Sequence, residues 1–241
     1  MKPIYKLTGF LPYILIVFLN ATVDLGHKIT LQNTIFKAYN GTELIIYTAI
    51  INALILLPFI LLFAPAGFLS DKYLKTKVVQ VAAFIAILIT IFITFSYYQG
   101  WFELAFALTL ILAAQSAIYS PAKYGLIKQL FGVKYIANAN AIVQAVTVVS
   151  ILLGALIYSY FFETLLANKS LVPSEILSII APLGFVLIGS SIAEFLLALK
   201  LPQEAREIYP AMVSELKKDL LGISSSTLIP ILVKGFQEQQ T

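Results

Sequence analysis

The sequence contains no cysteine, few charged residues and a single histidine. Without cysteine the chain can form no disulfide, no thiol-based catalytic site and no cysteine-ligated metal site. One histidine is too few for the imidazole-rich sites that bind zinc, so we expect no metal site. Only 12% of the residues are charged, which is about half the fraction of a soluble domain. The small net charge of +4 gives no indication of nucleic-acid binding.

The sequence also lacks the patterns that enzymes and ATP-driven pumps require. No G-x-x-x-x-G-K loop that would hold nucleotide phosphates occurs. Ser70 stands beside Asp71, but the only histidine, His27, is expected on the opposite side of a membrane. A nucleophile, a base and an orienting group therefore do not come together. We expect no catalytic residues, no cofactor and no enzyme activity.

Long apolar runs account for most of the chain, which is 60% hydrophobic. A helix that crosses about 30 Å of hydrocarbon needs about 20 apolar residues. We predict an all-α membrane protein whose first 200 residues form a six-span bundle. The first run has no small-residue cleavage site after it and is expected to be a retained helix, not a signal peptide. The six transmembrane helices are predicted near residues 10–31, 45–66, 78–97, 102–122, 137–162 and 176–199.

Lysine and arginine predict the orientation of the bundle, because they are enriched in cytoplasmic loops. Thirteen basic residues fall on one predicted side and three on the other, so both termini are expected in the cytoplasm. The thirteen are Lys2, Lys6, Lys72, Lys75, Lys77, Lys123, Lys128, Lys134, Lys200, Arg206, Lys217, Lys218 and Lys234, and the three are Lys28, Lys37 and Lys169.

Residues 201–241 form a tail of different composition. The stretch 203–221 is charged and is predicted to form an amphipathic helix on the cytoplasmic surface. The apolar stretch 228–233 is far too short to span a membrane, so we expect no seventh span.

Four polar side chains interrupt the first apolar run. Asn20, Asp24, His27 and Lys28 fall within about a third of the circumference of a helix. A carboxylate deep in lipid costs on the order of 3 kcal/mol even on lenient insertion scales. This face therefore predicts a transport or ligand site. The alternative is a structural Asp24 that pairs with Lys28 four residues later, and for His27 a hydrogen-bonding role is favoured over pH sensing.

Other polar residues inside apolar runs have simpler interpretations. Glu194 lies near Lys200, and snorkelling or a local ion pair is favoured over a role in transport. Asn52, Gln115 and Gln144 are predicted to form hydrogen bonds between helices, with cavity lining as the second interpretation.

The segment Gly67-Phe68-Leu69-Ser70-Asp71-Lys72 resembles the loop between spans two and three of the major facilitator superfamily. The bundle is accordingly expected to be the N-terminal half of such a transporter. In this reading Gly67 lets two helix ends approach closely, while Asp71 caps the next helix and pairs with a basic residue across the bundle. Gly67, Asp71 and Lys72 would form a cytoplasmic latch. The alternative is a plain basic loop that sets topology, and the usual second glycine is missing near Leu74.

The segment Ser120-Pro121-Ala122-Lys123-Tyr124-Gly125 resembles lysophospholipid transporters. It is also similar to the transporter domain that some bacteria fuse to acyltransferase and acyl-ACP ligase domains. The segments 20–28, 32–36 and 137–140 resemble the same family, and the resemblance covers roughly residues 8–200. Gln144 stands where some members carry a glutamate. The substrate path or gate implied by the resemblance comprises Asn20, Asp24, His27, Lys28, Gln32, Lys123, Tyr124 and Gln144.

The resemblance implies a secondary transporter that moves lysophospholipids across the bacterial inner membrane to the cytoplasmic leaflet, where they are re-acylated. The implied partners are the lipid bilayer, acyltransferase or acyl-ACP ligase domains, and a second six-span half or second copy, since the family has twelve spans. Two alternatives stay open. One is a proton-coupled facilitator of a small soluble solute, with Asp24 as proton carrier. The other is a truncated half-transporter that serves only as a membrane interaction module.

Overall fold

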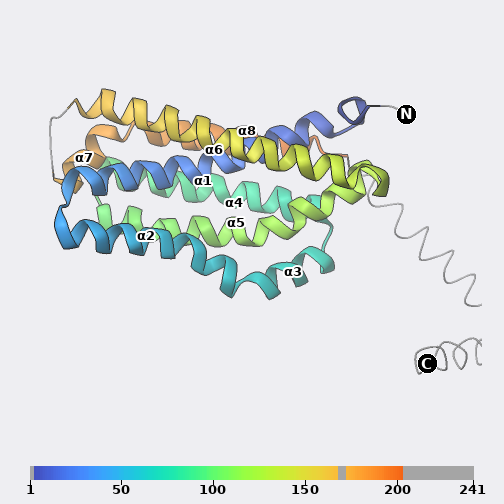
Figure 1. Cartoon of the computed structure of the whole chain (residues 1–241), viewed down its shortest axis with the longest axis horizontal. Helices are drawn as coiled ribbons and strands as arrows, with labels where there is room; N and C mark the ends of the chain where they lie inside the picture. The colour runs from blue at the N-terminus through green and yellow to red at the C-terminus, as the bar shows by residue number, and fades with distance from the viewer. Residues whose placement is uncertain (1–2, 168–171, 203–241) are drawn as a thin grey trace, which may run out of the picture. The chain divides into compact units, whose positions relative to one another are not determined.

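The computed structural model describes residues 3–167 and 172–202, which form a bundle of helices (Figure 1). The predicted tail helix over 203–221 lies outside the described residues. Within these ranges the chain contains helices and no strand. The helices are α1 (Phe10–Ala38), α2 (Gly41–Leu61), α3 (Phe63–Lys72), α4 (Lys75–Tyr98), α5 (Phe102–Phe131), α6 (Ile136–Leu166), α7 (Pro173–Ile180) and α8 (Leu183–Leu199), with short 3-10 turns at Ile4–Lys6 and Val133–Tyr135.

The helices meet the requirements of membrane spans and confirm the predicted all-α membrane fold. Five described helices are long and apolar enough to cross a bilayer, and α7 with α8 makes a sixth if the bent pair is one span. The helices α1, α5 and α6 have 29, 30 and 31 residues. At 1.5 Å per residue they are about 45 Å long, so they extend beyond the hydrocarbon core.

Two predicted spans are broken, and a proline stands at each break. The second span divides into α2 and α3 at Leu62. Pro65 lacks an N–H and cannot donate to the carbonyl of Leu61, so the hydrogen-bond ladder of α2 ends there. The last span divides into α7 and α8, which are bent by 55° at Ala181 and Pro182.

The segments 67–72 and 120–125, which carry the family resemblance, both lie in helices. This corrects the prediction for 67–72 and 123–125, which fall outside the predicted spans, and agrees with it for 120–122. Gly67 to Lys72 form the second half of α3. The stretch from Ser120 to Gly125 lies inside α5, which continues to Phe131 with Pro121 in its interior. Lys123 is therefore held within the bundle, and it does not contribute to a basic loop as the orientation count assumed.

The core consists of two apolar clusters, one towards each end of the bundle. One contains Val17 of α1, Tyr119 of α5 and Ala198 of α8. The other contains Val23 of α1, Leu112 of α5 and Leu187 of α8. Each of these three helices changes from one cluster to the other across a short polar stretch. These stretches form a polar layer near the middle of the bundle, made of Asn20 and Asp24 on α1, Gln115 and Ser116 on α5, and Ser191 and Glu194 on α8.

Candidate functional site

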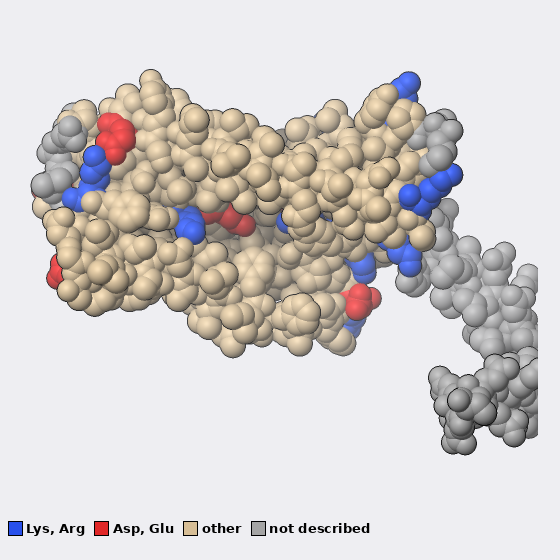
Figure 2. Space-filling view, viewed as in Figure 1, with Lys and Arg blue, Asp and Glu red and all other residues tan. Residues whose placement is uncertain are grey.

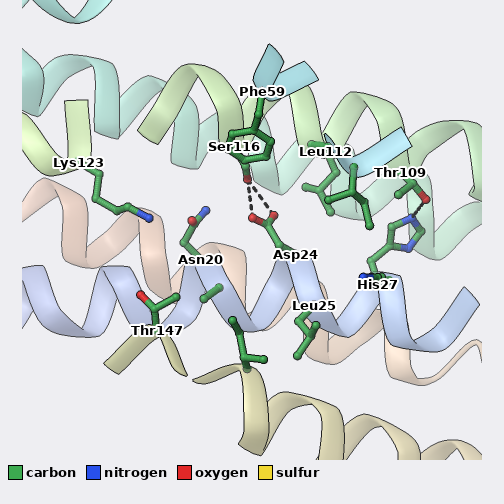
Figure 3. A pocket seen from close by; sticks show the side chains of 15 residues that line it. Asn20, Asp24, Leu25, His27, Phe59, Thr109, Leu112, Ser116, Lys123 and Thr147 are labelled. Atoms are coloured by element: carbon green, nitrogen blue, oxygen red, sulfur yellow. Dashed lines mark hydrogen bonds between the residues drawn. The ribbon is translucent and has the colours of Figure 1, made fainter. Parts of the chain in front are cut away.

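A cavity of about 270 Å³ opens beside the polar layer, between α1, α2, α5 and α6. Figure 3 shows Asn20 and Asp24 of α1 pointing towards α5, with Lys123 to one side. Figure 2 shows acidic and basic side chains inside a hollow near the middle of the visible face. The lining residues are Asn20, Ala21, Asp24, Leu25, His27, Lys28, Ile55, Phe59, Thr109, Leu112, Ala113, Ser116, Lys123, Thr147 and Ile151. The cavity thus joins a charged wall to apolar walls.

Asp24 is held by a hydroxyl from the facing helix. Ser116 Oγ of α5 lies 2.9 Å and 2.7 Å from the two carboxylate oxygens of Asp24. It also lies 3.2 Å from Gln115 Oε1, but its single proton can be donated to only one of these groups at a time, and the Asp24 oxygens are the nearer acceptors. Gln115 is in turn fixed by its Nε2, which donates to the carbonyl of Ala82 on α4 at 3.0 Å. The Asp24 carboxylate is therefore oriented into the cavity by a chain of contacts through α5 to α4.

His27 has a hydrogen-bond partner on each ring nitrogen. Its Nδ1 lies 2.7 Å from Tyr97 Oη on α4, and its Nε2 lies 3.1 Å from Thr109 Oγ1 on α5. The side chain is fully buried, and its ring stacks on Tyr97. These contacts fit the hydrogen-bonding role that was favoured for this histidine.

Two lysines line the cavity near Asp24. Among the described residues neither Lys28 nor Lys123 forms a salt bridge, so the i,i+4 pair between Asp24 and Lys28 is not present. Lys123 Nζ lies 5.3 Å and 5.2 Å from the ring centroids of Tyr119 and Tyr124. It interacts electrostatically with Asp24 and Glu194. The cavity therefore offers two cations that are not committed to a protein carboxylate.

Three of the predicted path residues do not line this cavity. Gln32 lies beyond it on α1. Gln144 on α6 donates through Nε2 to Tyr124 Oη on α5 at 3.3 Å, in an exposed contact. Tyr124 and Gln144 are thus the second and third of these residues, and they link α5 to α6 outside the cavity.

The three latch residues lie near one another on α3, but their contacts differ from those predicted. A Cβ at Gly67 would meet no atom within 4 Å, so this glycine does not mark a close approach. Asp71 does not cap α4, whose N-cap is Leu74 without a side-chain cap bond. Its carboxylate is exposed and lies 3.5 Å from Lys75 Nζ, while Lys72 Nζ stacks over Phe68 and Tyr73. Within the described helices Asp71 therefore pairs with its neighbour and not across the bundle.

Glu194 contradicts its predicted role. It is fully buried, and neither carboxylate oxygen has a hydrogen-bond partner. Because α8 packs against both α1 and α4, this side chain faces protein and cannot snorkel to the surface. The local ion pair with Lys200 is likewise not formed in the described part of the chain.

Several site residues carried no clear signal in the sequence. Ser116, Thr109 and Tyr97 are ordinary members of apolar helices when read singly. Ser116 falls one residue after Gln115, which in the sequence is only a lone polar residue of an apolar run. Their function depends on which residue of another helix they face, and an isolated polar residue in an apolar run gives no such information.

The arrangement of the site favours the binding of a ligand that has charged and apolar parts. The described residues contain no cluster of three or more histidine, aspartate or glutamate side chains that would hold a metal. The oriented carboxylate and two nearby lysines can contact a ligand that carries both charges, while Ile55, Phe59 and Ile151 accept its apolar part.

No family model matches the chain, and no solved structure matches it. The chain is 20% identical over 200 residues to a protein of Bacillus subtilis (strain 168) described as the uncharacterized MFS-type transporter YkuC. The match covers 79% of this chain and 44% of that protein, so the chain spans less than half the length of the relative. The all-helical bundle and this similarity together favour the major facilitator superfamily.

Proposed function

We propose that the protein is a secondary transporter that moves lysophospholipids across the bacterial inner membrane towards the cytoplasmic leaflet. The similarity to an MFS-type transporter supports transport in general and favours it over catalysis. The composition of the cavity wall is the observation that supports a lipid as the substrate. It places one carboxylate and two uncommitted lysines next to apolar side chains of α2 and α6.

A lysophospholipid matches both parts of this cavity. The phosphate would contact Lys123 or Lys28, and the ammonium of an ethanolamine headgroup would contact Asp24. A volume of about 270 Å³ suits a headgroup better than a whole lipid. The single acyl chain would extend between α2 and α6, past Phe59 and Ile151, and stay in apolar surroundings.

The distribution of lysines supports a cytoplasmic position for the end of the bundle where α1 begins. In the view of Figure 2 the basic side chains gather mainly at that end. At the other end Lys37 is neutralised by Glu163, whose oxygen lies 2.9 Å from its Nζ. The described lysines at the α1 starting end are Lys6, Lys72, Lys75, Lys77, Lys128, Lys134 and Lys200. This asymmetry is the one that the positive-inside rule requires.

A further part of the proposal is that a second six-helix half, or a second copy, closes the cavity. The cavity-lining helices α2 and α6 are also the least buried spans of the bundle. Re-acylation of the delivered lipid would then involve acyltransferase or acyl-ACP ligase domains on the cytoplasmic side.

The proposal is tested with the chain in lipid vesicles that contain fluorescent lysophosphatidylethanolamine, with leaflet exchange followed by quenching from outside. Asp24→Asn should abolish most of the protein-dependent exchange, because it removes the charge that faces the headgroup. Glu103→Gln is the matched control, since Glu103 is an exposed carboxylate at the start of α5. Both variants are first shown to insert and fold normally.

The same assay separates the rival functions. If soluble solutes move under a proton gradient while lysolipid does not, the protein is a facilitator of small solutes. If neither moves, the six-span chain acts as an interaction module. Unchanged lysolipid exchange in Asp24→Asn would assign Asp24 a structural role.

A further inference from the structure

Glu194 is the most unusual buried group that the proposed transport path does not use. Its side chain is fully buried, and both carboxylate oxygens lack a hydrogen-bond donor. Tyr119 on α5 is also buried, and its hydroxyl lacks a partner too. Burying an ionised carboxylate without a partner is far more costly than burying the neutral acid. This environment therefore favours a protonated Glu194.

Glu194 belongs to the same polar layer as Asp24. On α8 it falls between Leu187 of one apolar cluster and Ala198 of the other. On α1 Asp24 adjoins the same change of cluster, and on α5 the change falls between Leu112 and Tyr119. The two carboxylates thus occupy one level of the bundle on neighbouring helices.

The charged and titratable groups around Glu194 come from two facing helices. Glu194 interacts electrostatically with Asp24 of α1 and Lys123 of α5, and Tyr119 interacts with Glu194 and Tyr13. The helix α4 packs along α8 but carries its titratable residues only near its ends. These are Lys75, Lys77, Tyr97 and Tyr98, and those of α6 are Tyr158, Tyr160 and Glu163.

The cluster holds two acids and one base. With Asp24, Glu194 and Lys123 all ionised it would carry one excess negative charge inside the bundle, where an uncompensated charge is costly. Lys123 is not bound to either acid; its ammonium lies over the rings of Tyr119 and Tyr124. One added proton makes the cluster neutral.

We propose that Glu194, together with Tyr119, forms a proton-binding site. Whether Glu194 holds its proton depends on which of the two acids, Asp24 or Glu194, is balanced by Lys123. In the arrangement described, the proton is on a carboxylate oxygen of Glu194 and Lys123 balances Asp24. When the headgroup binds with its ammonium on Asp24 and its phosphate on Lys28, Lys123 no longer has to balance the charge of Asp24. It can then compensate Glu194, whose proton passes to water. Headgroup binding and proton release would in this way be coupled. This last coupling rests on the proposed function, whereas the proton site does not.

The site is tested by infrared spectroscopy of the purified full chain, which reports the C=O stretch of protonated carboxylic acids. A band present at neutral pH in the parent should disappear in Glu194→Gln, which is nearly isosteric and should fold. Glu103→Gln, which alters an exposed acid, should leave the band unchanged. If the parent lacks a band that Glu194→Gln removes, the proposal is wrong.

Two further variants test the charge balance. In Lys123→Met both acids lose their cation, so the protonated-acid band at neutral pH should grow to about twice its intensity. In Asp24→Asn Lys123 is free to serve Glu194, so the band should weaken. If neither variant changes the band, Glu194 is electrostatically independent of Asp24 and Lys123, and the proposed coupling is wrong. Because these measurements need no substrate, they can succeed even if lysolipid exchange is absent.

Discussion

At the scale of single residues, the site depends on small polar groups that orient larger charges. Asp24 would be free to rotate without a donor on the facing helix, and Ser116 supplies that donor. His27 is fixed similarly by Tyr97 and Thr109. Hydrogen bonds of this kind stabilise a charged group more than a neutral one, so the Ser116 hydroxyl is expected to stabilise the oriented Asp24 carboxylate.

Replacing Ser116 with alanine should therefore slow lysolipid exchange by about ten- to a hundredfold, since a hydrogen bond to a charged group contributes about 1.5–3 kcal/mol. Ser116→Thr keeps the hydroxyl and should retain most of the rate. The measurement is the vesicle exchange rate of each variant at equal protein density. Equal rates for the alanine and threonine variants would mean that Asp24 needs no donor from α5.

At the scale of helices, close packing of α1 against α6 positions the charged face of α1. A Cβ at Gly26 would lie 2.4 Å from the Tyr158 ring, so only glycine allows this approach. About two turns before Gly26, Ser150 Oγ of α6 donates to the carbonyl of Phe18 at 2.7 Å. About two turns after it, Asn33 Nδ2 donates to Ser159 Oγ at 3.1 Å. The register between the two helices is thus fixed at three levels.

Gly26→Ala should lower the stability of the bundle by about 1–3 kcal/mol, because an added methyl group would collide with the Tyr158 ring. Gly67→Ala is the control, since a Cβ there meets no atom within 4 Å. Thermal unfolding in detergent compares the two variants. Equal unfolding temperatures for the two variants would contradict the close approach of α1 and α6.

At the scale of the whole molecule, the cavity has walls from α1, α2, α5 and α6 only. The proposed transport function requires that the ligand be enclosed, which in turn requires a surface facing α2 and α6. The relative from Bacillus subtilis is more than twice the length matched here, which fits a second half of similar size. The apolar exposure of α2 and α6 agrees with the proposed neighbour.

Single cysteines test whether a second copy supplies that surface, and the cysteine-free chain gives them a clean background. Leu56→Cys on α2 or Leu152→Cys on α6 should cross-link two copies in membranes. Phe92→Cys on α4 is the control, because Phe92 is similarly exposed but lies on a helix that does not line the cavity. Cross-linking is read on denaturing gels, and equal yields at all three positions would indicate random collision.

The sequence alone determined that the protein is a bundle of membrane helices, because long apolar runs have one stable form in lipid. It also identified the polar face of Asn20, Asp24, His27 and Lys28, since helical periodicity is a local property. Only the tertiary structure decided the partners of these residues. Ser116 faces Asp24, Gln144 faces Tyr124 and Glu194 faces the interior because of how α5, α6 and α8 pack, and those contacts join residues far apart in the chain.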